Sequence, residues 1–150
     1  MIIDENNMSS FLEKLAETLS ENSKKDKSHI QFESFPLFQN ECLYVFDFSQ
    51  KKIIFKQGFQ NVLGYQDHEI TIDFITGLYH PDEAGLINRI IQASILYCLE
   101  YPENSSNNLL FLSFQLRKKD GTYIKILSQS YIYDIDKNGQ ISSVLIRFTD

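Results

Sequence analysis

The side chains that could do chemistry are few and widely spaced in this 150-residue sequence. Its two cysteines, Cys42 and Cys98, lie far apart, and neither forms a Cys-x-x-Cys motif. A disulfide or a zinc site needs such groups close together, so the better interpretation is that both thiols are buried and act as small hydrophobic side chains.

The three histidines do not indicate a hydrolytic site. A hydrolase holds a nucleophile beside a base that a third group orients, and the sequence has no Gly-x-Ser-x-Gly motif. His29 and His68 have the polar neighbours of surface residues, whereas His80 directly precedes a predicted helix, where a capping role is expected. We therefore expect no catalytic residue.

The acidic residues do not form a metal-ligand pattern either. Asp134-Ile-Asp-Lys-Asn-Gly resembles the start of a calcium loop, but the loop lacks the glutamate that such loops carry at their end. Its Asn138-Gly139 dipeptide favours a tight hairpin turn instead. Asp82 and Glu83 are the acids expected in the first turn of a helix. The sequence therefore predicts no metal site.

Composition limits the class of protein. Hydrophobic residues make up 43% of the chain and aromatic residues 13%, which suits one domain with a substantial core plus a tail. The net charge is −6 and the short basic clusters lie at predicted turns or in a polar linker, so we expect no nucleic-acid binding by this segment. No run approaches the roughly 20 apolar residues of a membrane helix, and the chain does not start like a secretory signal. A cytoplasmic location without membrane contact is expected.

The start of the chain predicts an amphipathic helix over residues 8–21. Ser10 and Glu13 have the spacing of a capping box. At helical spacing on one stripe lie Met8, Phe11, Leu12, Leu15 and Leu19. A polar linker follows, so residues 1–41 are expected to form a helix and linker outside a compact domain of residues 42–150.

Two groups of strands are expected in that domain. Aromatic and β-branched runs predict strands at residues 42–48 and 52–56. Near the end of the chain, Asp120-Gly121 and Asn138-Gly139 mark hairpin turns. These turns separate three further strands, expected at residues 109–118, 122–135 and 141–149.

Helices are expected between the two groups of strands. Short helical pieces come first, and a long helix then begins at His80-Pro81, with proline in its first turn. Its apolar face is predicted to include Leu86, Ile87, Ile90, Ile91, Ser94, Ile95 and Cys98. Such a wide face suits packing on a sheet.

The inner face of the closing strands and the long helix together predict the wall of a cavity. This wall would consist of Ile91, Ile95, Leu112, Phe114, Ile126, Ser128, Val144 and Ile146. Ligand pockets are mostly apolar with a few polar groups. The same residues suit a filled core equally well, so both interpretations stay open.

The outer face of these strands is too apolar for open water. It is expected to carry Phe111, Tyr123, Leu127, Tyr131, Tyr133, Ile141 and Leu145. Monomers rarely expose such a patch, so something should cover it. The predicted interface joins two sets of residues, in one chain or between symmetric partners. On the helix they are Phe11, Leu12, Leu15 and Leu19, and on the sheet Tyr131, Tyr133 and Leu145.

The order of these elements resembles the PAS domain. Three motifs carry the resemblance: Val62-Leu-Gly-Tyr, His80-Pro-Asp-Glu and Lys119-Asp-Gly-Thr. The resemblance implies an α+β fold, in which a five-stranded antiparallel sheet of order 2-1-5-4-3 carries helices on one face around a small cavity.

The resemblance also implies a sensory domain and not an enzyme. Haem-binding members present a histidine from the long helix, and flavin-binding light sensors carry an Asn-Cys-Arg-Phe-type motif at its start. Residues 82–100 have neither, so we expect no haem and no photoreactive flavin. If the predicted cavity binds a ligand, we expect a small molecule whose identity the sequence does not specify.

With its leading helix, the chain is similar to the sensor part of bacterial LuxR-type helix-turn-helix regulators. That similarity implies a homodimer and an output domain, helix-turn-helix or kinase, beyond residue 150. Two signalling alternatives stay open: the input domain of a histidine kinase or cyclase, and a ligand-free protein–protein interaction module. A small NTF2-like enzyme would need an inward acid–base pair, and the predicted inner face offers only serines.

Overall fold

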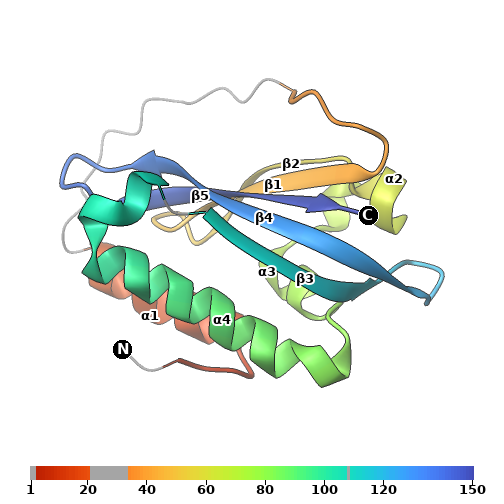
Figure 1. The fold of residues 1–150 in the computed structure, drawn as a ribbon, viewed down its shortest axis with the longest axis horizontal. Helices are drawn as coiled ribbons and strands as arrows, with labels where there is room; N and C mark the ends of the chain where they lie inside the picture. Colours follow the sequence, from red (N-terminus) through yellow and green to blue (C-terminus); the bar gives the residue numbers. More distant parts are fainter. Residues whose placement is uncertain (1–2, 21–33, 108) are drawn as a thin grey trace.

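The computed structural model describes residues 3–20, 34–107 and 109–150. One antiparallel sheet in the order β2-β1-β5-β4-β3 forms the centre of the fold (Figure 1). Its strands are β1 (Glu41–Asp47), β2 (Lys52–Gln57), β3 (Leu109–Arg117), β4 (Tyr123–Ile135) and β5 (Ile141–Thr149). The predicted fold class and strand order are confirmed.

Helices cover one face of this sheet. The two long ones, α1 and α4, lie along the same side of it (Figure 1). The α-helices are α1 (Met8–Ser20), α2 (Phe59–Leu63), α3 (Ile72–Thr76) and α4 (Pro81–Glu100), and the short 3-10 helices are η1 (Asp67–Glu69) and η2 (Pro102–Asn107). Among the described helices, none has the length and apolar character needed to cross a membrane.

Strand β1 is central and is buried on both faces. Its inward side chains Tyr44 and Phe46 belong to the main core, whereas Leu43 and Val45 are fully buried on the opposite face. Part of that opposite face is covered by the segment before β1. The Phe35 ring packs edge-on against Phe55, and the backbone of Phe35 exchanges two hydrogen bonds of 2.9 and 3.0 Å with the side chain of Gln57 on β2.

The long helix begins as expected, and Ile87 and Cys98 of its predicted face are buried, but the buried face is turned around the helix relative to the prediction. His80 caps it, because its Nδ1 accepts a hydrogen bond of 3.2 Å from the backbone N–H of Asp82. Leu86, predicted on the apolar face, is 52% exposed, while Asn88 and Gln92 are buried. The expectation was wrong at these positions because the start of the chain packs along this side of α4.

Two buried amides of α4 bind the backbone at the start of the chain. The Gln92 side chain accepts from the N–H of Asp4 at 2.7 Å and donates to the carbonyl of Asp4 at 2.6 Å. Asn88 donates to the carbonyl of Glu5 at 3.0 Å, and Arg89 forms an ion pair of 3.3 Å with the Glu5 carboxylate. Buried amides are usually hydrogen-bonded, and these contacts hold Asp4 and Glu5 against α4, although Asn88 Oδ1 has no hydrogen-bond partner among the described residues.

The predicted docking of the N-terminal helix was wrong. Phe11 and Leu15 are fully buried in the main core, on the helix-covered face of the sheet and not on the outer face. Helix α1 contacts α3 and α4, and the Ser9 hydroxyl donates to the Asp73 carboxylate at the start of α3. The side chain of Leu19 lies outside the described residues.

The cap of α1 also differs from the predicted box. Asn7 precedes the helix, and its side-chain oxygen accepts a hydrogen bond of 2.9 Å from the backbone N–H of Ser10. The helix therefore begins at Met8, as the predicted range of residues 8–21 has it, but with Asn7 and not Ser10 as its cap. A side-chain cap of this kind satisfies one of the free N–H groups of the first turn.

The outer face is partly as expected. Exposed on it or next to it are Phe111, Tyr123, Leu127, Tyr131, Tyr133 and Ile135. Two residues of the predicted patch are buried instead. Leu145 lies between Val45 and Tyr131 in the sheet, with 8% of its surface exposed. Ile141 belongs to the main core, because the pairing of β4 with β5 shifts register twice near Asp134 and so interrupts the alternation of faces.

Candidate functional site

A pocket of about 270 Å³ lies between the inner face of the sheet and the helices. Four groups of elements form its wall: α1, the α3 region, α4, and strands β1, β3, β4 and β5. The lining residues are Met8, Leu12, Tyr44, Phe46, Phe48, Ile72, Ile75, Thr76, Tyr79, Ile91, Ser94, Ile95, Tyr97, Cys98, Leu110, Phe114, Ser128, Ser130, Tyr131, Ile132, Ile141, Val144, Ile146 and Phe148.

Most of the predicted wall lines this pocket. The lining includes Ile91, Ile95, Phe114, Ser128, Val144 and Ile146. It does not include Leu112, which packs against the core, or Ile126, which is fully buried within it. The predicted role of these residues in binding a ligand stays a prediction.

Several lining residues were not predicted. Tyr44 and Phe46 come from β1, where the alternation of the strand already placed them on one face, so that pattern could have identified them. Met8 and Leu12 come from α1, and no local signal places that helix over the pocket. Of the predicted interface residues, Leu12 and Tyr131 contribute to the pocket wall.

Hydroxyl groups supply the polarity of the pocket. Tyr44, Tyr79, Ser128 and Ser130 are among the lining residues, and Tyr44, Tyr79 and Ser128 are buried. Burial raises the pKa of Tyr79, and it is also the main cause that raises the pKa of Tyr44, followed by the neighbouring Tyr79 and Cys42. Both phenols therefore keep their protons at neutral pH and can donate hydrogen bonds.

Two other polar side chains of the lining have partners on the protein. The Ser94 hydroxyl donates to the carbonyl of Ile91 at 2.7 Å, and the Thr76 hydroxyl donates to the carbonyl of Asp73 at 3.1 Å. Both bonds lie within a helix and are typical of serine and threonine in that setting. The hydroxyl hydrogens of Ser94 and Thr76 are therefore already used within the helices and are not available to a ligand.

The pocket offers no reactive constellation. Among the described lining residues, none is an acid, a base or a histidine. Both cysteines are buried and neither forms a disulfide. Burial, with a smaller contribution from Asp67, raises the pKa of the Cys42 thiol, so this thiol stays protonated and weakly nucleophilic. The described lining therefore supplies no nucleophile beside a general base.

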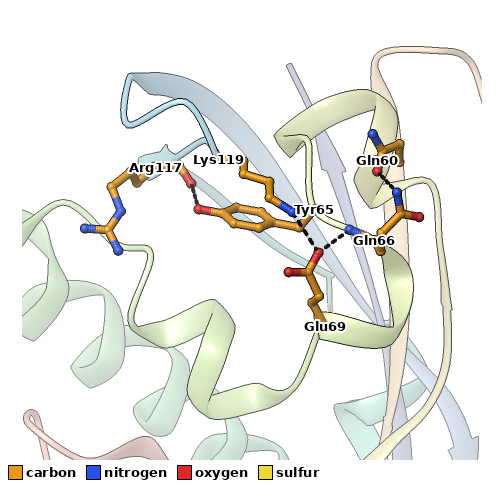
Figure 2. Close-up of polar contacts among 6 residues, drawn as sticks. All are labelled: Gln60, Tyr65, Gln66, Glu69, Arg117 and Lys119. Carbon is orange, nitrogen blue, oxygen red and sulfur yellow. Dashed lines mark hydrogen bonds and ion pairs between the residues drawn. The ribbon is translucent and has the colours of Figure 1, made fainter.

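A polar cluster fastens the β3–β4 hairpin to the short helices. Figure 2 shows the Glu69 carboxylate accepting from the backbone N–H of Gln66 at 2.7 Å and from Lys119 Nζ at 3.4 Å. The Lys119 ammonium also lies 5.9 Å from the centre of the Tyr65 ring. Because these contacts are at the surface, each contributes little stability, but together they hold the hairpin beside η1.

We expect Glu69→Gln to weaken the acid dependence of stability. The Gln66 hydrogen bond, followed by Lys119, lowers the pKa of Glu69. The group therefore contributes stability above its unfolded pKa, and that contribution is lost as pH falls through the folded pKa. Thermal melts across the acidic range should show a shallower decline for E69Q than for the wild type. Glu13→Gln on the exposed face of α1 is the control, and an E69Q curve identical in shape to the wild type would contradict the assignment.

Comparison with known proteins gives one matching family model. The model is described as the PAS fold and matches residues 52–146. No curated protein matches the chain.

Solved structures share the fold at low identity. The N-terminal domain of a diguanylate cyclase with PAS/PAC sensor from Marinobacter aquaeolei is 12% identical with a TM-score of 0.57, over 73% of this chain and 94% of that one. A PAS domain from Colwellia psychrerythraea is 19% identical with a TM-score of 0.53, over 73% and 85%. The light-state dimer of the fungal blue-light photoreceptor Vivid is 17% identical with a TM-score of 0.53, over 83% and 87%.

Proposed function

The chain belongs to the PAS-fold family, and from that premise we propose that it is the non-catalytic regulatory domain of a bacterial signalling protein. In this proposal a small molecule enters the pocket and shifts the packing of α1 and α4 against the sheet. A ligand can bias two arrangements only if it contacts them differently. The domain would pass this bias to an output domain beyond residue 150.

One observation carries this proposal: the pocket wall is built from both the sheet and the helices. Met8 and Leu12 of α1 and Ile91 and Ile95 of α4 face the same cavity as Ser128 of β4. A molecule in the cavity would therefore contact the rigid sheet and both long helices together. Because packed interfaces switch between discrete arrangements, a small displacement there can be amplified at the ends of the helices.

We propose that the full-length protein is a LuxR-type transcription regulator, because the sequence resembles the sensor part of that family. The leading helix supports this assignment, because it is an integral part of the core and its residues Met8 and Leu12 line the pocket. A histidine kinase or a cyclase is the alternative host. The sequence that follows residue 150 in the gene decides between a helix-turn-helix and these catalytic output domains.

A thermal-shift screen with a metabolite library, combined with native mass spectrometry of the purified chain, tests the sensory role. We expect at least one compound to raise the melting temperature by several degrees, because a ligand at one hundred times its Kd stabilises the folded state by about 2.7 kcal/mol. A chain that carries no small molecule and responds to none would contradict this role. The alternative of a ligand-free protein–protein interaction module would then be favoured.

The domain is also proposed to form a homodimer through the outer face of its sheet. Phe111 and Leu127 are 52% and 42% exposed there, and isolated monomers rarely leave such patches open. Vivid, which has a similar fold, was solved as a dimer in its light state.

Sedimentation velocity tests this interface. We expect Phe111→Glu combined with Leu127→Glu to weaken dimerisation at least tenfold, because charges then face each other across an apolar contact. Leu86→Glu is the matched control, since Leu86 of α4 is equally exposed, at 52%, but lies on another surface. An unchanged dimer in the double variant, or an equal effect of L86E, would contradict the assignment.

A further inference from the structure

The absence of charge in the described pocket wall restricts what the pocket can hold. Its lining combines aliphatic and aromatic side chains with hydroxyl groups, and none of the described lining residues is lysine, arginine, histidine, aspartate or glutamate. An ionised group buried against such a wall loses its hydration without gaining a counter-ion. The free energy of this desolvation is far larger than the free energy gained from a hydrogen bond to a hydroxyl. The wall therefore selects against molecules whose charged group would have to be buried in it.

The pocket volume sets the size of its ligand. An apolar cavity of about 150 Å³ accommodates benzene, so the 270 Å³ measured here takes roughly ten or eleven non-hydrogen atoms in proportion. A haem or a flavin nucleotide is several times larger than this. A short aliphatic chain or one substituted ring fits.

The hydroxyl groups set the polar feature of that ligand. Tyr44 and Tyr79 stay protonated because burial raises the pKa of each, and Ser128 and Ser130 bring two aliphatic hydroxyls from β4. All four can donate a hydrogen bond, so a neutral acceptor such as a carbonyl oxygen is matched best. A purely apolar molecule would exclude water from these hydroxyls without offering them a hydrogen-bond partner.

We propose that the pocket binds an uncharged amphiphile of about ten non-hydrogen atoms that carries one neutral hydrogen-bond acceptor, such as an amide, ester or ketone carbonyl. This inference rests on the proposed sensory function and specifies its ligand class. It follows from the charge-free wall, the volume and the buried phenols together.

Octanamide and octanoate form a matched pair of probes for this inference. Both have ten non-hydrogen atoms and nearly the same shape, but only octanoate is charged at pH 8. Isothermal titration of the full chain should show octanamide binding about a hundredfold more tightly than octanoate at that pH, because the charged group must be buried without a partner. As the pH falls toward the carboxyl pKa, octanoate should bind more tightly through its neutral acid form, while octanamide affinity should stay constant.

Removing the phenolic hydroxyls tests which groups hold the acceptor. The double variant Tyr44→Phe, Tyr79→Phe keeps both rings and should weaken octanamide binding about tenfold. Tyr101→Phe is the control, because Tyr101 is 40% exposed and does not line the pocket. Circular dichroism establishes that each variant is folded.

The outcomes separate this inference from the sensory role. Octanoate binding at pH 8 as tightly as octanamide would overturn the neutral-ligand inference and leave a sensor of charged molecules. Binding of neither probe would also overturn it, and the metabolite screen then judges the sensory role independently. Tight octanamide binding without any effect of the double tyrosine variant would overturn the part assigned to the phenols.

Discussion

Leu15→Ala should lower the free energy of unfolding by about 2 to 5 kcal/mol, the range found for leucine truncated in a packed core. The Leu15 side chain is fully buried in the main core, although it belongs to a helix that precedes the sheet by many residues. Truncation removes apolar contacts and leaves a cavity beside α3 and α4. Chemical denaturation monitored by circular dichroism measures the loss, with the transition midpoint moving while the slope stays constant.

The control for this prediction lies two residues away, on the exposed side of the same helix. Glu13→Ala changes an exposed side chain of α1 and should alter stability by less than about 0.5 kcal/mol. A similar, small effect of both substitutions would show that α1 is not packed in solution as it is here. Fluctuation of α1 alone would appear as a low-denaturant transition separate from the main one.

Gly58→Ala should be the most damaging of the glycine substitutions. Gly58 has φ of +89°, and a Cβ there would lie 2.7 Å from the carbonyl oxygen of Glu41 and 3.1 Å from Cα of Cys42. The left-handed conformation alone costs roughly 1 to 2 kcal/mol for a residue with a side chain. Because the clashing atoms belong to the backbone of β1, relief requires the sheet to shift, and we expect a total loss above about 3 kcal/mol.

Gly121→Ala isolates the conformational part of that cost. Gly121 has φ of +88°, nearly the same as Gly58, but an added Cβ would meet nothing within 4 Å. Denaturant melts should therefore give a loss of about 1 to 2 kcal/mol for G121A and clearly more for G58A. Equal losses would mean that the contact between Gly58 and β1 is looser than described.

The strands could be predicted from the sequence because each is a local pattern. Alternating apolar residues and the Asp120-Gly121 and Asn138-Gly139 turns determine three strands and their faces within a few residues, and both glycines adopt positive φ. The prediction fails for Ile141, where two register shifts in β4 and β5 reverse the alternation. Nothing in the local sequence indicates such a bulge.

The position of the N-terminal helix could not be predicted for a different reason. An amphipathic stripe requires burial but does not specify the surface that buries it. The contacts that decide the position are long-range, since Gln92 and Asn88 bind backbone groups of Asp4 and Glu5, which are 88 and 83 residues away in the chain. Both amides were overlooked because polar residues within a helix are expected to face water.

The candidate pocket was predicted in part for the same reasons. Alternation along β3, β4 and β5 places Phe114, Ser128 and Val144 on the inner face, and all three line the pocket. The wall contributed by α1 depends on the long-range docking just described. Whether a set of inward residues leaves a cavity or fills it depends on packing in three dimensions, which a pattern of residue types does not contain.

The central claim is that occupancy of the pocket changes the packing of α1 as well as that of the sheet. Hydrogen exchange of the full chain, with and without saturating octanamide, tests this claim directly. We expect backbone amides of α1 to exchange at least several-fold more slowly with the probe bound, together with those of β4 and β5, because Met8 and Leu12 share the wall with Ser128. Slower exchange in β4 and β5 with no change in α1 would contradict the account, since ligand binding would then leave the packing of α1 unaltered.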